Sequence, residues 1–267
     1  MERSRLKNII LLILLLMNLA LAASLGLRIA QGRAAEAALL SELRLRFEAE
    51  GCALPEDIPS ETPPPVVTLE RDSQRELAMA EAILGEGVTA AGQGGGIVVY
   101  QGVSGQATFR TGGGFSVTLR LPDGESSSVD QAEQLARAFA RAAGFETPTL
   151  LSGSGSAAQR YEGFPVSGAG ALFTLRGSTF LAEGSCLPSA YLSRTEGPAM
   201  SAATALVRFL DFRRESGAVI SAVTEVQLSY VLQSTASAPM TLSPAWRIAT
   251  DSGDYLVSCG DGSVSRG

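Results

Sequence analysis

An uncharged apolar run from Ile9 to Leu27 dominates the start of the chain. A short head, residues 1–8, precedes it and carries Arg3, Arg5 and Lys7. A helix over the run would be roughly 28 Å long at ~1.5 Å per residue, close to the ~30 Å hydrocarbon core of a bilayer. The pattern predicts a transmembrane helix over 9–27, with the head in the cytoplasm and the rest of the chain outside. The expected localisation is therefore the cell membrane, with a single span.

A cleavable signal peptide is the alternative, because Ala20-Leu21-Ala22 has the small-x-small spacing of a cleavage site. Downstream, residues 28–50 mix charged residues with Ala and Leu at helical spacing and predict a juxtamembrane helix. Prolines then recur up to the run Pro63-Pro64-Pro65. They predict an extended spacer, so residues 28–65 connect the span to the outer part.

Beyond the spacer, apolar residues at helical spacing alternate with short β-rich segments bounded by glycine. Helices are predicted over Glu70–Leu84, Ser128–Ala143 and Ala199–Glu215, each ended by a glycine. Strands are predicted over Ile97–Tyr100, Ala107–Arg110, Phe115–Leu121, Phe164–Val166, Ala171–Leu175, Thr179–Glu183, Ala218–Leu232, Ala245–Thr250 and Tyr255–Cys259.

A helix followed by antiparallel strands recurs at residues 128–183 and 199–259. This recurrence predicts an α+β fold built of repeated units, in which helices cover one face of each antiparallel sheet. The Ser-Gly alternation over 152–156 indicates a flexible link. We therefore expect a first α+β domain over 66–152 and a second over 153–267.

Composition excludes many catalytic systems, because the chain has no His and Lys7 is its only Lys. Nucleophiles activated by an imidazole or a neutral amine cannot be assembled outside the head. Histidine zinc sites are excluded as well, and three scattered cysteines give no CxxC pair. We expect no enzyme, no metal and no cofactor; acid-base catalysis by paired carboxylates is the one enzymatic alternative left open.

Charge also restricts the partners. Beyond residue 27 the chain has eighteen Arg against twenty-six Asp and Glu, a net charge of −8. Nucleic acid is not expected as a partner, because phosphate binding needs clustered cations.

The number of cysteines limits the disulfides. Cys52, Cys186 and Cys259 form no even set, so at most one disulfide is possible.

Two segments carry a resemblance to a known family. They are Tyr161-Glu162-Gly163-Phe164-Pro165-Val166 and the stretch from Glu225-Val226-Gln227-Leu228-Ser229-Tyr230 through Leu242–Ile248 to Tyr255–Val257. Together with a basic head, one span and a spacer, they resemble the YycI/YycH family of two-component regulatory proteins. The sequence pattern of the C-terminal segments also resembles PepSY modules.

The resemblance implies a regulatory partner rather than a substrate. Members of the family bind a sensor histidine kinase of the WalK type and tune cell-wall homeostasis, and a YycH-like co-regulator is a second implied partner. The alternative is a PepSY-like extracellular module that inhibits or chaperones a secreted or cell-wall hydrolase.

Two residues are candidates for partner binding. Asn18 lies inside the apolar run, where an amide seeks a polar partner on another helix; the alternative is a hydrogen bond to its own backbone. Trp246 is an aromatic residue of the kind that dominates interface hot spots, and the alternative is a core position beside Pro244.

Overall fold

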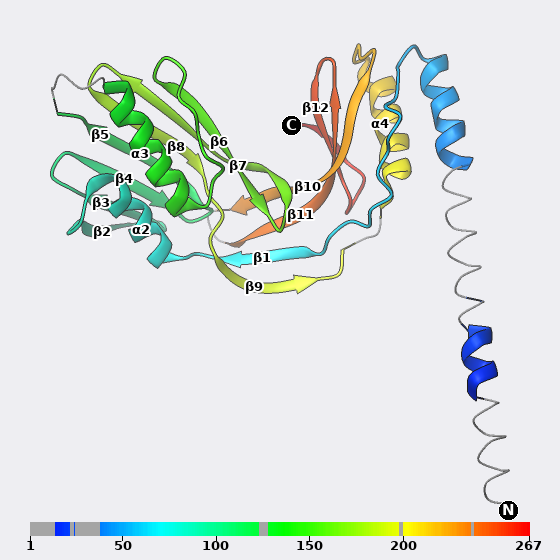
Figure 1. The fold of residues 1–267 in the computed structure, drawn as a ribbon, viewed down its shortest axis with the longest axis horizontal. Coiled ribbons are helices and arrows are strands. Elements are labelled where there is room, and N and C mark those ends of the chain that lie inside the picture. The colour runs from blue at the N-terminus through cyan, green and yellow to red at the C-terminus, as the bar shows by residue number, and fades with distance from the viewer. Residues whose placement is uncertain (1–13, 22–23, 25–37, 123–127, 198–199, 236–237) are drawn as a thin grey trace, which may run out of the picture.

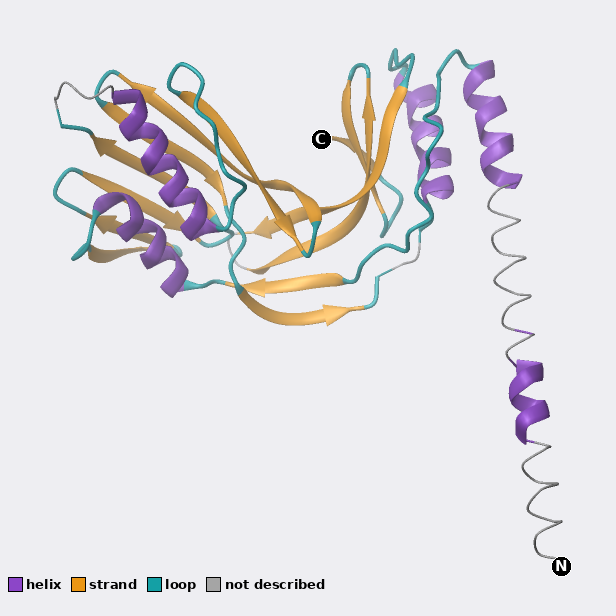
Figure 2. Ribbon diagram, viewed as in Figure 1, coloured by secondary structure: helices purple, strands orange, loops and turns teal. Residues whose placement is uncertain are grey.

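A computed structural model describes residues 14–21, 24, 38–122, 128–197, 200–235 and 238–267. Strands contribute more of these residues than helices do, and the helices are short (Figure 2). The labelled elements are β1 (Val66–Glu70), α2 (Ser73–Leu84), β2 (Thr89–Gly94), β3 (Ile97–Gln101), β4 (Gly105–Arg110), β5 (Gly114–Arg120), α3 (Ser128–Ala143), β6 (Ser154–Tyr161), β7 (Phe164–Arg176), β8 (Thr179–Ser185), β9 (Ala190–Thr195), α4 (Ala202–Ser216), β10 (Val223–Thr235), β11 (Ala238–Thr250), β12 (Gly253–Ser258) and β13 (Val264–Arg266). Helical residues also lie at 14–21 and 38–49.

The described strands form one mixed, 13-stranded sheet in which the long strand β7 joins two halves (Figure 1). The main path runs in the order β13-β12-β11-β10-β7-β8-β5-β4-β3-β2. In the first half β5 pairs antiparallel with β8, and β7 pairs with β6 and β8. In the second half β10, β11 and β12 form an antiparallel meander. The junction is parallel, with Tyr230 opposite Val166 and Val231 opposite Ser167.

The predicted fold class is therefore wrong. The sequence pattern favoured separate α+β units with their own antiparallel sheets, whereas the strands belong to one large mixed sheet. Period-2 patterns identify strands but not their neighbours, so the parallel β7–β10 junction left no local signal. The expected domain boundary between residues 152 and 153 would separate β5 from β8, although these two strands pair in the sheet. The division into two domains stays a prediction.

The predicted transmembrane helix is also not supported. Residues 14–21 are helical and exposed, and the rest of the 9–27 run except residue 24 lies outside the described residues. Among the described residues, no helix combines the length and the apolarity that crossing a bilayer requires. The head at 1–8 and Ala22 of the expected cleavage site also fall outside the described residues.

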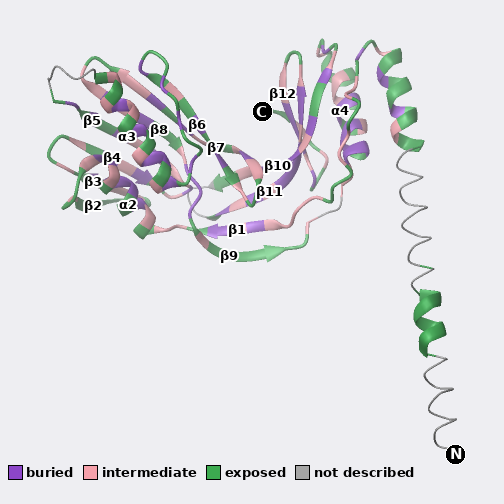
Figure 3. Ribbon diagram, viewed as in Figure 1, coloured by how far each residue is buried: buried purple, intermediate pink, exposed green. Residues whose placement is uncertain are grey.

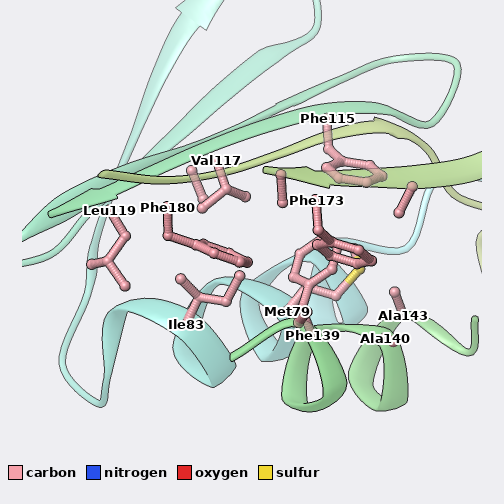
Figure 4. Packing of buried hydrophobic residues seen from close by; sticks show 14 of the residues in the cluster. Met79, Ile83, Phe115, Val117, Leu119, Phe139, Ala140, Ala143, Phe173 and Phe180 are labelled. Atoms are coloured by element: carbon pink, nitrogen blue, oxygen red, sulfur yellow. The ribbon is translucent and has the colours of Figure 1, made fainter. Parts of the chain in front are cut away.

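Helices α2 and α3 cover one face of the first half and enclose the largest core. Figure 4 shows Met79, Ile83 and Phe139 pointing from the helices toward aromatic and aliphatic side chains of the strands. The Phe139 ring lies 4.9 Å from that of Phe115 and 6.2 Å from that of Phe173, centroid to centroid. Such tilted and edge-on contacts add to the free energy gained by burying the rings.

The second half has its own core beneath α4 and the helix at 38–49. Leu43 and Phe47 from that helix are buried against α4 and the β10–β12 meander. Arg213 on α4 secures the helix end by pairing with the Glu50 carboxylate at 3.2 Å and donating to its carbonyl at 3.0 Å. Figure 3 shows the buried residues concentrated where these helices face the sheet.

Candidate functional site

A groove of about 540 Å³ lies where the two halves of the sheet meet. Three segments form its walls: the extended chain over 57–61, the turn between β6 and β7, and residues 225–228 of β10. Its volume is within the range of ligand sites, ~300 to 1,000 Å³. Each wall comes from a distant part of the sequence, so only the folded chain forms the groove.

The first wall is the spacer between the helix at 38–49 and β1. Ala53 makes an isolated parallel bridge with Ala222 just before β10, with its N–H 2.9 Å from the Ser221 carbonyl. At its other end the Tyr230 hydroxyl donates to the Pro65 carbonyl at 2.9 Å. Burial raises the pKa of Tyr230 to about 12, which keeps this hydroxyl protonated and able to donate. The spacer is thus fixed to β10 at both ends.

The second wall is the tight turn that joins β6 to β7. Glu162 and Gly163 both have positive φ, 50° and 89°, as the two central residues of a type I′ hairpin require. Arg160 donates to the Gly163 carbonyl at 2.6 Å and to the Glu146 carboxylate at 2.9 Å. The carboxylate of Glu162 pairs with Arg194 on β9. These contacts orient Phe164 and Pro165 toward the groove.

The third wall is a stretch of β10 with one unpaired edge. The carbonyl of Pro244 accepts from the Cys259 amide and thus points toward β12. Its partner across the β10–β11 ladder, Tyr230, therefore directs its own main chain away from β11, toward β7. By the alternation of an antiparallel ladder, Val226 and Leu228 direct theirs the same way.

Among the described residues, no strand pairs with this edge of β10 between Ala222 and Tyr230. Continuing the parallel ladder from β7 by two residues would require an N–H at residue 165, and Pro165 has none. The acceptor that precedes β7 in the turn, the Gly163 carbonyl, already accepts a hydrogen bond from Arg160. The local sequence therefore ends the β7–β10 ladder and leaves main-chain groups facing the groove.

Carboxylates dominate the charge at the rim of the groove. Asp57, Glu61 and Glu225 line it and are exposed. Arg160 is the cation of the lining, and its bonds to Glu146 and Gly163 occupy it. Glu225 lies 3.5 Å from Arg247, a pair weakened by solvent since Glu225 is 56% exposed. The rim is therefore negative and complements a cationic ligand.

Neither of the two predicted partner-binding residues lines this groove. Trp246 is fully buried in the second core and donates from Nε1 to the Met200 carbonyl at 2.9 Å. Its side chain is not available to a partner here, which agrees with the core interpretation. Asn18 is exposed on the helix at 14–21, and its pairing with another helix stays a prediction.

The cysteines do not form a reactive site. Cys52, Cys186 and Cys259 are all free and buried. Burial raises the pKa of Cys186 to about 12 and that of Cys259 to about 11, so both thiols stay protonated at neutral pH and are weak nucleophiles. No group of three or more His, Cys, Asp or Glu with metal-binding geometry occurs in the part of the chain that the structure describes.

Another groove, of about 550 Å³, lies between α2 and α3 in the first half. Its walls include Ile83, Leu119, Leu121 and Leu135, so it is more apolar than the groove beside β10. Its lining includes Pro122, and the next residues in the sequence, 123–127, lie outside the described residues. The groove beside β10 is the stronger candidate, because its lining is described throughout and includes unpaired main chain.

Sequence reasoning did not identify the groove residues. Pro165 inside a predicted strand was the available signal, because proline within a sheet marks an interrupted ladder. The acidic residues Asp57 and Glu61 in the spacer gave no signal on their own, since their position beside Glu225 depends on the fold.

No protein-family model matches the chain, and no curated protein matches it significantly. Among solved structures, the chain is similar to the crystal structure of an uncharacterised protein from Eubacterium rectale. The two are 10% identical, with a TM-score of 0.46, over 81% of this chain and 91% of the other.

Proposed function

We propose that this chain is a non-catalytic regulatory protein that binds another protein through the groove beside β10. The observation that carries the proposal is the coincidence of unpaired strand edge and negative rim in one groove of about 540 Å³. Main chain that lacks a strand partner is suited to recognising a polypeptide, because it can complete a hydrogen-bonded ladder. The absence of His and the protonated state of the buried thiols disfavour the common nucleophilic mechanisms.

The partner we propose is a sensor histidine kinase of the WalK type, as the resemblance to YycI/YycH regulators implies. Two segments that carry the resemblance, Tyr161–Val166 and Glu225–Tyr230, also contribute residues to two of the walls of the groove. This coincidence supports a role for the groove in regulation. Inhibition of a hydrolase by occupying its cleft is less well supported. An inhibitor of that kind inserts a segment into the cleft of the hydrolase, whereas the groove beside β10 can accept a segment of the partner.

Site-specific photocrosslinking of the full chain in its own host tests the proposal. A photoreactive amino acid replaces Gln227, a partly exposed lining residue, and the matched control carries it at Glu81 on the exposed side of α2. We expect Gln227 to crosslink to a sensor kinase, identified by mass spectrometry, and Glu81 not to. Crosslinks from Gln227 that match the control, or that lead only to a hydrolase, would contradict the proposed partner.

A further inference from the structure

We infer that the groove beside β10 binds an extended, basic polypeptide segment by strand addition, in which the segment pairs with the main chain of Val226 and Leu228. The inference rests on the proposed function and specifies how the partner is recognised.

The unpaired edge has defined ends. The Ala53–Ala222 bridge closes it on one side and the Tyr230–Val166 pairing closes it on the other. Tyr230 lies eight residue steps along the chain from Ala222, a span of roughly 26 Å at ~3.3 Å per residue. Because Ala53 and Pro165 occupy its two ends, we expect a guest strand of about four to five residues.

The two faces of the sheet at this edge have different chemistry. The side chains of Val226 and Leu228 are buried in the second core, where Ile58 and Phe164 pack beside them. Glu225 and Gln227 alternate with them and lie on the opposite face. A guest strand that continues the sheet therefore presents apolar residues to the first face and polar residues to the second.

Charge determines which polar residues fit. Asp57, Glu61 and Glu225 surround the groove, and Arg160 is held by Glu146 and the Gly163 carbonyl. A segment that alternates basic and apolar residues satisfies both the rim and the alternation of the sheet. An acidic segment is repelled, because the lining has three exposed carboxylates and one arginine, which is itself paired with Glu146.

The probe is a capped hexapeptide of alternating Val and Lys, titrated into the full chain by fluorescence anisotropy. We expect it to bind, and a Val/Glu hexapeptide of the same length not to bind. N-methylation of either all Val amides or all Lys amides then tests the pairing. Only one set faces β10, so one methylated peptide should bind about 10- to 30-fold more weakly, from two lost hydrogen bonds, while the other keeps its affinity.

Amide hydrogen exchange provides a direct readout of the strand edge. On probe binding, the amides of Val226 and Leu228 should exchange more slowly, and that of Gln227, which already faces β11, should not change. Asp57→Asn with Glu61→Gln should weaken probe binding about 2- to 10-fold. The matched variant Glu81→Gln with Glu86→Gln, exposed and outside the groove, should leave the affinity as it is.

The negative results of these experiments lead to different conclusions. No binding of the Val/Lys probe, or equal loss with both methylated peptides, overturns strand addition of a basic segment. Probe binding without protection of Val226 and Leu228 overturns it as well and leaves the groove as a protein-binding site. If the probe behaves as expected while Gln227 crosslinks to no kinase, the strand-addition site holds and the proposed function fails.

Discussion

Cys186 lies at the junction of the two halves, beneath the N-terminal turn of α2, and its burial makes stability depend on pH. The residue is 5% exposed, and burial raises the pKa of its thiol from about 9 to about 12. The unfolded chain therefore loses this proton at lower pH than the folded chain does. The stabilising contribution is complete below about pH 9 and is lost as the pH rises toward 12.

Replacing Cys186 with Ala should therefore make the loss of stability in alkali shallower. The measurement is the free energy of unfolding in urea at several pH values between 8 and 11. A single such group changes the slope by at most ~1.4 kcal/mol per pH unit. Tyr230 and Cys259 have raised pKa values too, so the variant should still lose some stability. An identical pH dependence in parent and variant would contradict the buried, protonated thiol.

At the scale of elements, the β6–β7 hairpin depends on its turn. Gly163 has φ of +89°, and an added Cβ would meet no atom within 4 Å, so a substitution there costs backbone energy alone. Gly163→Ala should lower the free energy of unfolding in urea by about 1–2 kcal/mol, because an L-residue is disfavoured at positive φ. Gly260→Ala is the control, since its φ is ordinary and its nearest contact is Ser258 Oγ at 3.5 Å. Equal effects of the two would contradict the type I′ turn.

Helices were the elements that the sequence predicted best, because their signals are local. The predicted Ser128–Ala143 helix has the bounds of α3, and Gly144 follows it with φ of +69°. α2 begins three residues later than predicted, because Asp72 accepts a hydrogen bond from the Arg75 amide and caps the helix. The residues before the cap, Val66–Glu70, form β1, which pairs with β9 and β11.

Pairings between distant strands could not be predicted from periodicity. β5 pairs with β8 and β7 with β10 across long stretches of intervening chain, and an alternating pattern specifies a face but not a neighbour. The groove beside β10 could not be predicted from the sequence for the same reason. Its acidic rim, its hairpin wall and its unpaired edge come together only because β7 and β10 adjoin.

At the scale of the whole molecule, that shared sheet should make the two halves unfold together. A third cluster of buried residues, including Val166, Tyr230 and Leu242, lies at the junction and connects the two larger cores. Trp246 is the only Trp and is buried in the second half, so its fluorescence reports that half, whereas far-UV circular dichroism reports both. We expect the two signals to give one coincident urea transition.

Breaking the parallel junction should separate the transitions. Ser167 lies opposite Val231, and the ladder register directs its N–H to the Tyr230 carbonyl. Ser167→Pro removes this donor, so the fluorescence transition of Trp246 should shift to a different urea concentration from the circular dichroism transition. Ser167→Ala keeps the N–H and should retain coincidence. Coincident transitions in the proline variant would mean that the packed junction core, rather than the ladder, couples the two halves, and that the groove could persist without the β7–β10 pairing.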